Sequence, residues 1–115
     1  MPSIDIAVPC YQYGHFLADC LDSILEQGPA GLRVLVLDNA STDDSIEVAR
    51  EYARRDGRVS VATHARNIGP TACYNEAIDW AAADYFLLID ADDVLAPGAL
   101  QRALAVLEAS PGVVM

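Results

Sequence analysis

The stretch Tyr85-Phe86-Leu87-Leu88-Ile89-Asp90-Ala91-Asp92-Asp93 places five large apolar residues directly before three carboxylates. An apolar run of this length is typical of a strand buried on both faces, as in a parallel sheet. Hard carboxylate oxygens gathered where such a strand ends suit a divalent cation such as Mg²⁺ or Mn²⁺, which would in turn hold a phosphate. The alternative is a solvated acidic turn that stops the strand and caps the next helix.

Strand-like and helix-like segments alternate along the chain. Short apolar runs predict strands at 4–8, 32–37, 59–63 and 85–89, and Val113-Val114-Met115 resembles a fifth strand cut short. Apolar residues at helical spacing predict helices between them, at 16–25, 42–55, 70–82 and 97–109. This βαβαβαβαβ order predicts an α/β fold, a doubly wound and mostly parallel sheet with helices on both faces.

Local signals set some of these boundaries. Pro9 is expected to end the first strand, and Pro70 suits the first turn of the third helix. Ser41 and Asp44 resemble a capping box with Asp in place of Glu, so the second helix is expected to begin beside them.

In doubly wound sheets, ligands bind beyond the carboxyl ends of the strands. This rule places four loops on one edge of the sheet, at 9–15, 38–43, 64–70 and 90–95. Two of the strands end directly in an aspartate, Asp38 and Asp90. Solvated loops would also be polar, but they would not account for an aspartate at both strand ends.

Three side chains in these loops are candidates for holding a nucleotide. Asp38 could accept a hydrogen bond from a base imide or a ribose hydroxyl, a role we favour because Asp38 lies one residue too early to be needed as a helix cap. Tyr11 could pack on a planar base or lie half-buried against the first helix. Arg66, beside the start of the third helix, could bind a diphosphate or be a surface arginine beside a turn glycine.

The acidic run offers metal ligands. Asp90 and Asp92 would point to the same side if the strand continued that far, so one could take the metal directly and the other the ribose or a metal-bound water. Asp93 is either a third participant or the start of a capping turn.

Four other titratable side chains receive no role in this interpretation. A lone histidine is more often a polar surface or capping residue than a catalyst, and the two acidic residues are expected on the solvated face of the third helix. These four are His15, His64, Glu76 and Asp79.

The charge balance excludes several classes of function. Seven basic residues stand against 17 acidic ones, a net charge of −10, which argues against nucleic acid and anionic membranes as partners. All the basic residues are arginines, so a P-loop nucleotide hydrolase and a phospho-acceptor receiver domain, which each need a lysine, are excluded. No glycine-rich turn follows the first strand, as a Rossmann dinucleotide-binding enzyme would require.

Length, cysteine content and hydropathy indicate one domain in a reducing cytoplasm. The 115 residues, 53% of them apolar, are enough for a single core. The three cysteines lack CxxC spacing and are expected to be small buried residues rather than disulfide or zinc ligands. The longest apolar stretches are too short to span a membrane, and the N-terminus lacks a secretory signal.

Five segments together resemble the N-terminal, nucleotide-binding half of the family-2 glycosyltransferases, which have the GT-A fold. Each segment alone is a weak signal, but the five stand in register at family-like spacing over essentially the whole chain. The segments are Ile6-Ala7-Val8-Pro9-Cys10-Tyr11, Phe16-Leu17-Ala18-Asp19-Cys20-Leu21-Asp22-Ser23-Ile24, Val36-Leu37-Asp38-Asn39-Ala40-Ser41-Thr42-Asp43-Asp44-Ser45, Arg66-Asn67-Ile68-Gly69, and Asp90-Ala91-Asp92-Asp93 with Pro97-Gly98 behind it.

The resemblance implies a donor site and a reaction. The residues implied to hold the nucleotide are Pro9, Tyr11, Asp38, Arg66, Asn67, Gly69 and Asp90. Asp92 and Asp90, with Asp93 as a further candidate, would hold a Mn²⁺ or Mg²⁺ on the diphosphate. The implied reaction is direct displacement with inversion of the sugar, assisted by a metal that stabilises the departing nucleoside diphosphate.

The resemblance also implies that residues 1–115 form one donor-binding domain without the acceptor-binding part. GT-A domains are roughly twice this length, and the family's catalytic base comes from the part after Met115, so the base is not assigned and this chain alone is expected to bind donor without completing transfer. Self-association would bury apolar surface that the missing half normally covers. Asn39-Ala40 stands where many members have Asp-Gly.

The expected setting is polysaccharide, lipopolysaccharide or other glycoconjugate synthesis in the cytoplasm, at the inner face of the membrane in a full-length protein. The donor would be a nucleotide-diphosphate sugar, and the acceptor a glycan, lipid or protein; the sequence specifies neither the sugar nor the base. The alternative function is a non-catalytic nucleotide-binding or scaffolding α/β domain.

Overall fold

The computed structural model describes residues 3–29 and 31–109. Within them the elements are β1 (Ser3–Cys10), α1 (Gly14–Leu25), β2 (Gly31–Asp38), α2 (Ser45–Arg55), β3 (Val59–Thr63), α3 (Pro70–Trp80), β4 (Tyr85–Leu88) and α4 (Ala99–Ala109). These strands form one parallel sheet in the order β3-β2-β1-β4. The predicted α/β class is confirmed, with α3 ending and α4 beginning two residues from the predicted positions. The expected strand at 113–115 lies outside the described residues.

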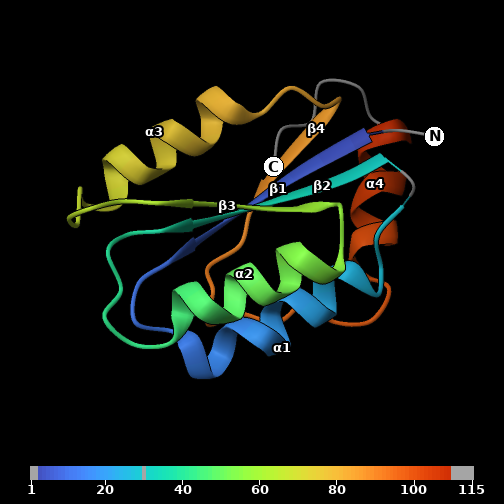
Figure 1. The fold of residues 1–115 in the computed structure, drawn as a ribbon. Coiled ribbons are helices and arrows are strands. Elements are labelled where there is room, and N and C mark those ends of the chain that lie inside the picture. Colours follow the sequence, from blue (N-terminus) through green and yellow to red (C-terminus); the bar gives the residue numbers. More distant parts are fainter. Residues whose placement is uncertain (1–2, 30, 110–115) are drawn as a thin grey trace.

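The strand order creates a switch point between β1 and β4 (Figure 1). The chain moves from β1 to β2 and β3 with α1 and α2 on one face, then returns through α3 on the opposite face and places β4 on the other side of β1. Right-handed crossovers require this change of face, because the direction of travel across the sheet reverses. The loops after β1 and β4 therefore leave in different directions, at the position where such sheets bind ligands.

Each face of the sheet has its own apolar core. On β1, Ile4, Ile6 and Val8 pack with α1 and α4, whereas Ala7 packs with α3 on the other face, as the alternation of side chains along a strand requires. The cysteines are buried and unpaired, as predicted: Cys10, Cys20 and Cys73. No helix among the described residues has both the length and the apolar character needed to cross a membrane.

Pro9 lies inside β1, so the expectation that it ends the strand is wrong. β1 continues to Cys10, and Pro9 pairs with Leu37 of β2. The carbonyl of Pro9 accepts a hydrogen bond from Ala91 N–H at 3.2 Å, on the side where β4 has already ended at Leu88. Because the N–H and C=O of a strand residue point to the same side, the missing proline N–H leaves no bond of the sheet unmade.

The predicted capping box is also wrong. α2 begins at Ser45 rather than beside Ser41, and Ser45 N–H donates to Asp43 Oδ1 at 2.9 Å. The other oxygen of Asp43 accepts a hydrogen bond from Gly14 N–H at 3.0 Å, at the start of α1. Burial disfavours the charged form of Asp43, but the hydrogen bonds from Ser45 and Gly14 outweigh it and lower its pKa. One carboxylate therefore joins the N-termini of two helices.

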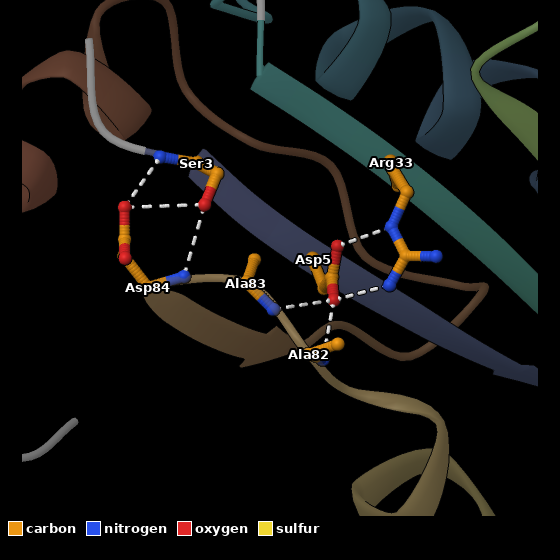
Figure 2. Close-up of polar contacts among 6 residues, drawn as sticks. All are labelled: Ser3, Asp5, Arg33, Ala82, Ala83 and Asp84. Carbon is orange, nitrogen blue, oxygen red and sulfur yellow. Dashed lines mark hydrogen bonds and ion pairs between the residues drawn. The ribbon is translucent and has the colours of Figure 1, made fainter.

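Near the amino ends of the strands, the fully buried Asp5 of β1 accepts four hydrogen bonds (Figure 2). Arg33 on β2 donates through Nε at 2.8 Å and Nη2 at 2.6 Å, and the N–H groups of Ala82 and Ala83 donate at 2.8 and 3.0 Å. Burial disfavours the charged form, but the Arg33 hydrogen bond and the two N–H groups outweigh it, so the pKa of Asp5 lies below its ordinary value of 3.8. The Arg33 guanidinium also lies 4.6 Å from the centre of the Trp80 ring. Asp5 thus ties β1, β2 and the segment entering β4 together.

Candidate functional site

The four predicted loops meet at the carboxyl ends of the strands. Backbone hydrogen bonds hold them together, from Asn39 N–H to Cys10 O at 2.9 Å, His64 N–H to Asp38 O at 3.0 Å, and Ala91 N–H to Pro9 O at 3.2 Å. A cavity of about 300 Å³ lies between these loops and the start of α3. It is lined by Pro9, Cys10, Tyr11, Tyr13, Asn39, Asn67, Pro70, Cys73, Tyr74 and Asp90.

Two tyrosines at this cavity keep large exposed faces. Tyr11 is 46% exposed and Tyr74 is 38% exposed. Tyr13, rather than Tyr11, packs against the core beside the first helix, edge-on to Phe16 with ring centroids 6.1 Å apart. Tyr74 is not singled out by the sequence, and its only signal is helical spacing, because it follows Pro70 by one turn on the side of α3 that faces the loops.

Asp38 is fully buried at the end of β2 and has one unsatisfied oxygen. Its Oδ2 accepts a hydrogen bond from Ser41 N–H at 2.9 Å, whereas its Oδ1 has no partner among the residues that the structure describes. A buried carboxylate oxygen without a partner is rare and costly. Asp38 does not itself line the cavity, but the next residue, Asn39, does. A ligand would reach Oδ1 through side-chain movement at the cavity wall, which is common on binding.

The amides of Asn39 and Asn67 join the loops after β2 and β3. Asn39 Nδ2 donates to Asn67 Oδ1 at 2.9 Å, and both side chains line the cavity. Gly69 supplies the turn into α3 with a φ of +83°, a conformation that favours glycine, but it does not line the cavity. Arg66 is exposed and also lies outside the lining residues. Of the three candidates in this loop, Asn67 alone reaches the cavity.

A histidine without a predicted role contacts this amide pair. His64 Nδ1 lies 3.2 Å from Asn39 Oδ1, and Nε2 lies 2.6 Å from Glu76 Oε2. Glu76 keeps 42% of its side chain exposed and in addition contacts His64, and Asp79 is exposed as predicted. His64 directly follows β3 and Glu76 lies on α3, so their contact depends on how these two elements pack. No local sequence pattern predicts it.

The carboxylates of Asp90, Asp92 and Asp93 gather after β4. One oxygen from each lies within 4.8 Å of the others, and all three residues are exposed. Asp93 N–H donates to the carbonyl of Asp90 at 2.9 Å, so Asp93 both closes a turn and joins the cluster. Burial, followed by the charges of Asp93 and Asp92, raises the pKa of Asp90. The three charges repel one another, and a bound divalent cation would relieve this repulsion.

A larger hollow of about 860 Å³ lies between α1 and the chain entering α4. Asp19, Asp22 and Glu26 line it from α1, and Val94 and Leu95 line it from the other side. It contains none of the predicted site residues and no aromatic side chain. Size alone therefore does not identify the functional site, and the smaller cavity at the switch point is the better candidate.

The sheet order and the cavity at its switch point define a Rossmann-like α/β domain. Residues 5–115 match the family model described as Glycosyl transferase family 2, and the chain belongs to this family.

Similar proteins agree with this assignment. The uncharacterized glycosyltransferase EpsJ of Bacillus subtilis is 32% identical over 102 residues, which cover 89% of this chain and 29% of the relative. The mannosyltransferase PcManGT from Pyrobaculum calidifontis, solved in complex with GDP-Man and Mn²⁺, superposes with a TM-score of 0.87 at 28% identity, covering 97% of this chain and 34% of that one. TarS of S. aureus in complex with UDP-GlcNAc gives a TM-score of 0.83 at 25% identity, covering 93% and 31%. The chain thus spans about a third of these proteins.

Proposed function

We propose that residues 1–115 form one domain that binds the nucleotide-sugar donor of a glycosyltransferase. The whole protein then transfers the sugar with inversion to a glycan, lipid or protein acceptor during glycoconjugate synthesis. Family membership supports this proposal, as do the two similar structures whose complexes hold GDP-Man and UDP-GlcNAc. In this proposal the nucleotide occupies the cavity between the strand-end loops and the start of α3, with its diphosphate toward Asp90, Asp92 and Asp93.

The observation that carries the proposal is Asp38 Oδ1, a buried oxygen without a partner among residues 3–29 and 31–109, beside a cavity that is lined by tyrosines. A base imide N–H or a ribose hydroxyl is a donor of the kind this oxygen lacks. The exposed rings of Tyr11 and Tyr74 offer apolar faces to a planar base. A nucleoside bound here would satisfy the buried acceptor and cover both rings.

The residues after β4 fit a hard divalent cation. Asp92 and Asp90 would hold it, with Asp93 as a third ligand, and Asp90 also lines the cavity. The cluster offers carboxylate oxygens only, which suits Mn²⁺ or Mg²⁺ better than metals that prefer thiolate or imidazole. When bound, such a cation would compensate the charge of the departing diphosphate.

The protein's own residues bind and orient the donor. Pro9, Tyr11 and Asp38 would hold the base. Asn67 would contact the donor from the side of the cavity nearest α3, and Asp90 would accept a hydrogen bond from the ribose. The chain carries a net charge of −10, so an anionic diphosphate needs local positive charge. The exposed Arg66, beside the N-terminus of α3, is free to supply part of that charge.

The proposal is tested by mapping amide NMR shifts during titration with UDP-GlcNAc or GDP-mannose, with Mg²⁺ present. We expect the largest shifts at Tyr11, Asn39 and Tyr74. Replacing Mg²⁺ with paramagnetic Mn²⁺ is expected to broaden the signals of residues 90–95 first. Shifts confined to the hollow between α1 and α4, or no shifts with either compound, would contradict the proposal.

A further inference from the structure

Two backbone N–H groups fix the orientation of both asparagine amides beside the cavity. Ile68 N–H donates to Asn39 Oδ1 at 2.8 Å, so this oxygen is an acceptor. Gly69 N–H donates to Asn67 Oδ1 at 2.8 Å, so the atom of Asn39 that approaches Asn67 Oδ1 is the donor Nδ2. Turning either amide over would bring donors against donors.

This orientation fixes the proton on His64. Asn39 Oδ1 is an acceptor, so Nδ1 of His64, 3.2 Å away, carries a hydrogen. The other ring nitrogen, Nε2, lies 2.6 Å from Glu76 Oε2, which accepts when ionised. A neutral imidazole has one N–H and can satisfy only one of these two contacts. The observed pair of contacts therefore holds one further proton, between Nε2 and the Glu76 carboxyl.

One carboxylate, that of Glu76 on α3, contacts the ring of His64. At the end of β2 the contact is between backbone groups, because the backbone N–H of His64 donates to the backbone carbonyl of Asp38 at 3.0 Å. Burial, then Glu76 and Asp38, raises the pKa of Cys73, so this thiol remains neutral. Arg66 follows in the same loop and makes no ion pair with any residue between 3 and 109 that the structure describes. The extra proton thus lies between the His64 ring and the carboxylate of Glu76.

We propose that His64 and Glu76 are positioning residues for the donor cavity, and that the proton they share holds Asn39 in place and so strengthens donor binding. The inference rests on the proposed function. His64 and Glu76 do not line the cavity and act through Asn39, which does. His64 is 13% exposed and Glu76 is 42% exposed, so the proton exchanges readily with solvent.

Loss of the proton breaks one of two contacts. If the hydrogen remains on Nδ1, the lone pair of Nε2 faces the carboxylate of Glu76 and the two repel. If the hydrogen moves to Nε2, the lone pair of Nδ1 faces Asn39 Oδ1. The chain of contacts from α3 to Asn39 is interrupted in either case, between His64 and Glu76 in the first and between His64 and Asn39 in the second. The Ile68 and Asn67 contacts of Asn39 remain in both.

The test measures the affinity for UDP-GlcNAc and GDP-mannose between about pH 5.5 and about pH 8.5, the range in which histidine changes charge. Both phosphates of these compounds are esterified, so their charge stays constant over this range. For the wild type we expect affinity to fall about tenfold as the pH rises, the effect of one charge-assisted hydrogen bond.

Three variants separate positioning from a structural role. Glu76→Gln donates its amide N–H to a neutral His64 ring, so we expect wild-type affinity at low pH and no loss at high pH. His64→Ala is expected to bind weakly at every pH. His15→Gln removes the chain's other histidine, which is exposed at the start of α1, and is expected to keep the wild-type profile. The same pH profile in wild type and Glu76→Gln would overturn the inference.

A second measurement examines the proton without any nucleotide. In the ligand-free protein, we expect nitrogen NMR to show a hydrogen on Nδ1 of His64, the ring nitrogen that lies against the acceptor Asn39 Oδ1. A neutral ring with its hydrogen on Nε2 would overturn the inference. If the ring behaves as expected but neither compound binds at any pH, the proposed function fails and the coupling to the donor fails with it.

Discussion

The carboxylate of Asp38 accepts a hydrogen bond from Ser41 N–H at 2.9 Å through Oδ2, while its buried Oδ1 faces no donor among the described residues. Ala40, between them, has a φ of +66° that turns the chain back onto Asp38. The loop thus holds the carboxylate rigidly with one acceptor unused. The unused acceptor destabilises the ligand-free fold, and the same acceptor is available to a bound ligand.

Asp38→Asn is expected to weaken nucleotide affinity at least tenfold, because a charge-assisted acceptor is lost. The melting temperature of the ligand-free protein is expected not to fall, because the substitution replaces a buried charge with a neutral amide whose oxygen can still accept the Ser41 N–H hydrogen bond. Calorimetric titration and thermal unfolding measure the two effects. Asp79→Asn, an exposed change on α3, is the control and should alter neither. Wild-type affinity in Asp38→Asn would show that the buried oxygen does not contact the nucleotide.

Mn²⁺ is expected to raise the melting temperature of the wild type, since a cation that binds the folded state stabilises it, by about 2.7 kcal/mol at a hundred times its Kd. Asp92→Asn should remove most of this effect. Asp19→Asn, in the acidic hollow beside α1, should retain it. Equal stabilisation of all three proteins would indicate nonspecific binding to an acidic surface.

The raised pKa of Asp90 adds a pH dependence to that experiment. Ionisation of Asp90 is less favourable in the folded than in the unfolded state, so its contribution to stability is greatest at low pH and is lost as the pH rises through the folded pKa. Mn²⁺ should reverse this penalty by pairing with the ionised form. Unfolding scans across the acidic range, with and without the ion, are expected to diverge as the pH rises. Scans that stay parallel would argue against a cation at Asp90.

Asp5→Ala is expected to lower the free energy of unfolding by about 3 kcal/mol, because it removes a fully buried carboxylate and leaves Arg33 and the N–H groups of Ala82 and Ala83 without their shared acceptor. Since the pKa of Asp5 is lowered by folding, its contribution is present above the unfolded pKa and is lost as the pH falls through the folded one. Urea unfolding at neutral and acidic pH measures both. The exposed Asp84, which accepts hydrogen bonds from Ser3, is the control, and Asp84→Ala should cost much less. Similar losses for the two variants would remove the special role of Asp5.

Ala40→Gly is expected to raise the free energy of unfolding by about 1 kcal/mol, because a residue with a Cβ is strained at a φ of +66°. Ala65→Gly is the matched control in an exposed loop; Ala65 has no positive φ, so that change should be neutral or destabilising. A stability gain in both variants, measured by urea unfolding, would contradict the backbone explanation.

The sequence was most informative where periodicity and strand ends determine the structure. The apolar runs before Asp38 and Asp90 predicted two strands, and parallel topology then predicted that their loops would meet. It was least informative where long-range contacts decide. Pro9 is accommodated only because β4 is short, and the start of α2 is set by Asp43 bridging to α1. Tyr74 and the His64–Glu76 contact depend on how α3 lies across the sheet, which local patterns do not encode.

The most direct test of the central claim is calorimetric titration of the chain with UDP and with GDP, each with and without Mn²⁺, repeated on Asp92→Asn. We expect one nucleotide to bind, with an affinity that increases in the presence of Mn²⁺ and a Mn²⁺ effect that disappears in the variant. This result would place the donor at the switch point and identify its base. Absence of binding by both nucleotides, or binding that neither Mn²⁺ nor Asp92→Asn alters, would contradict the account.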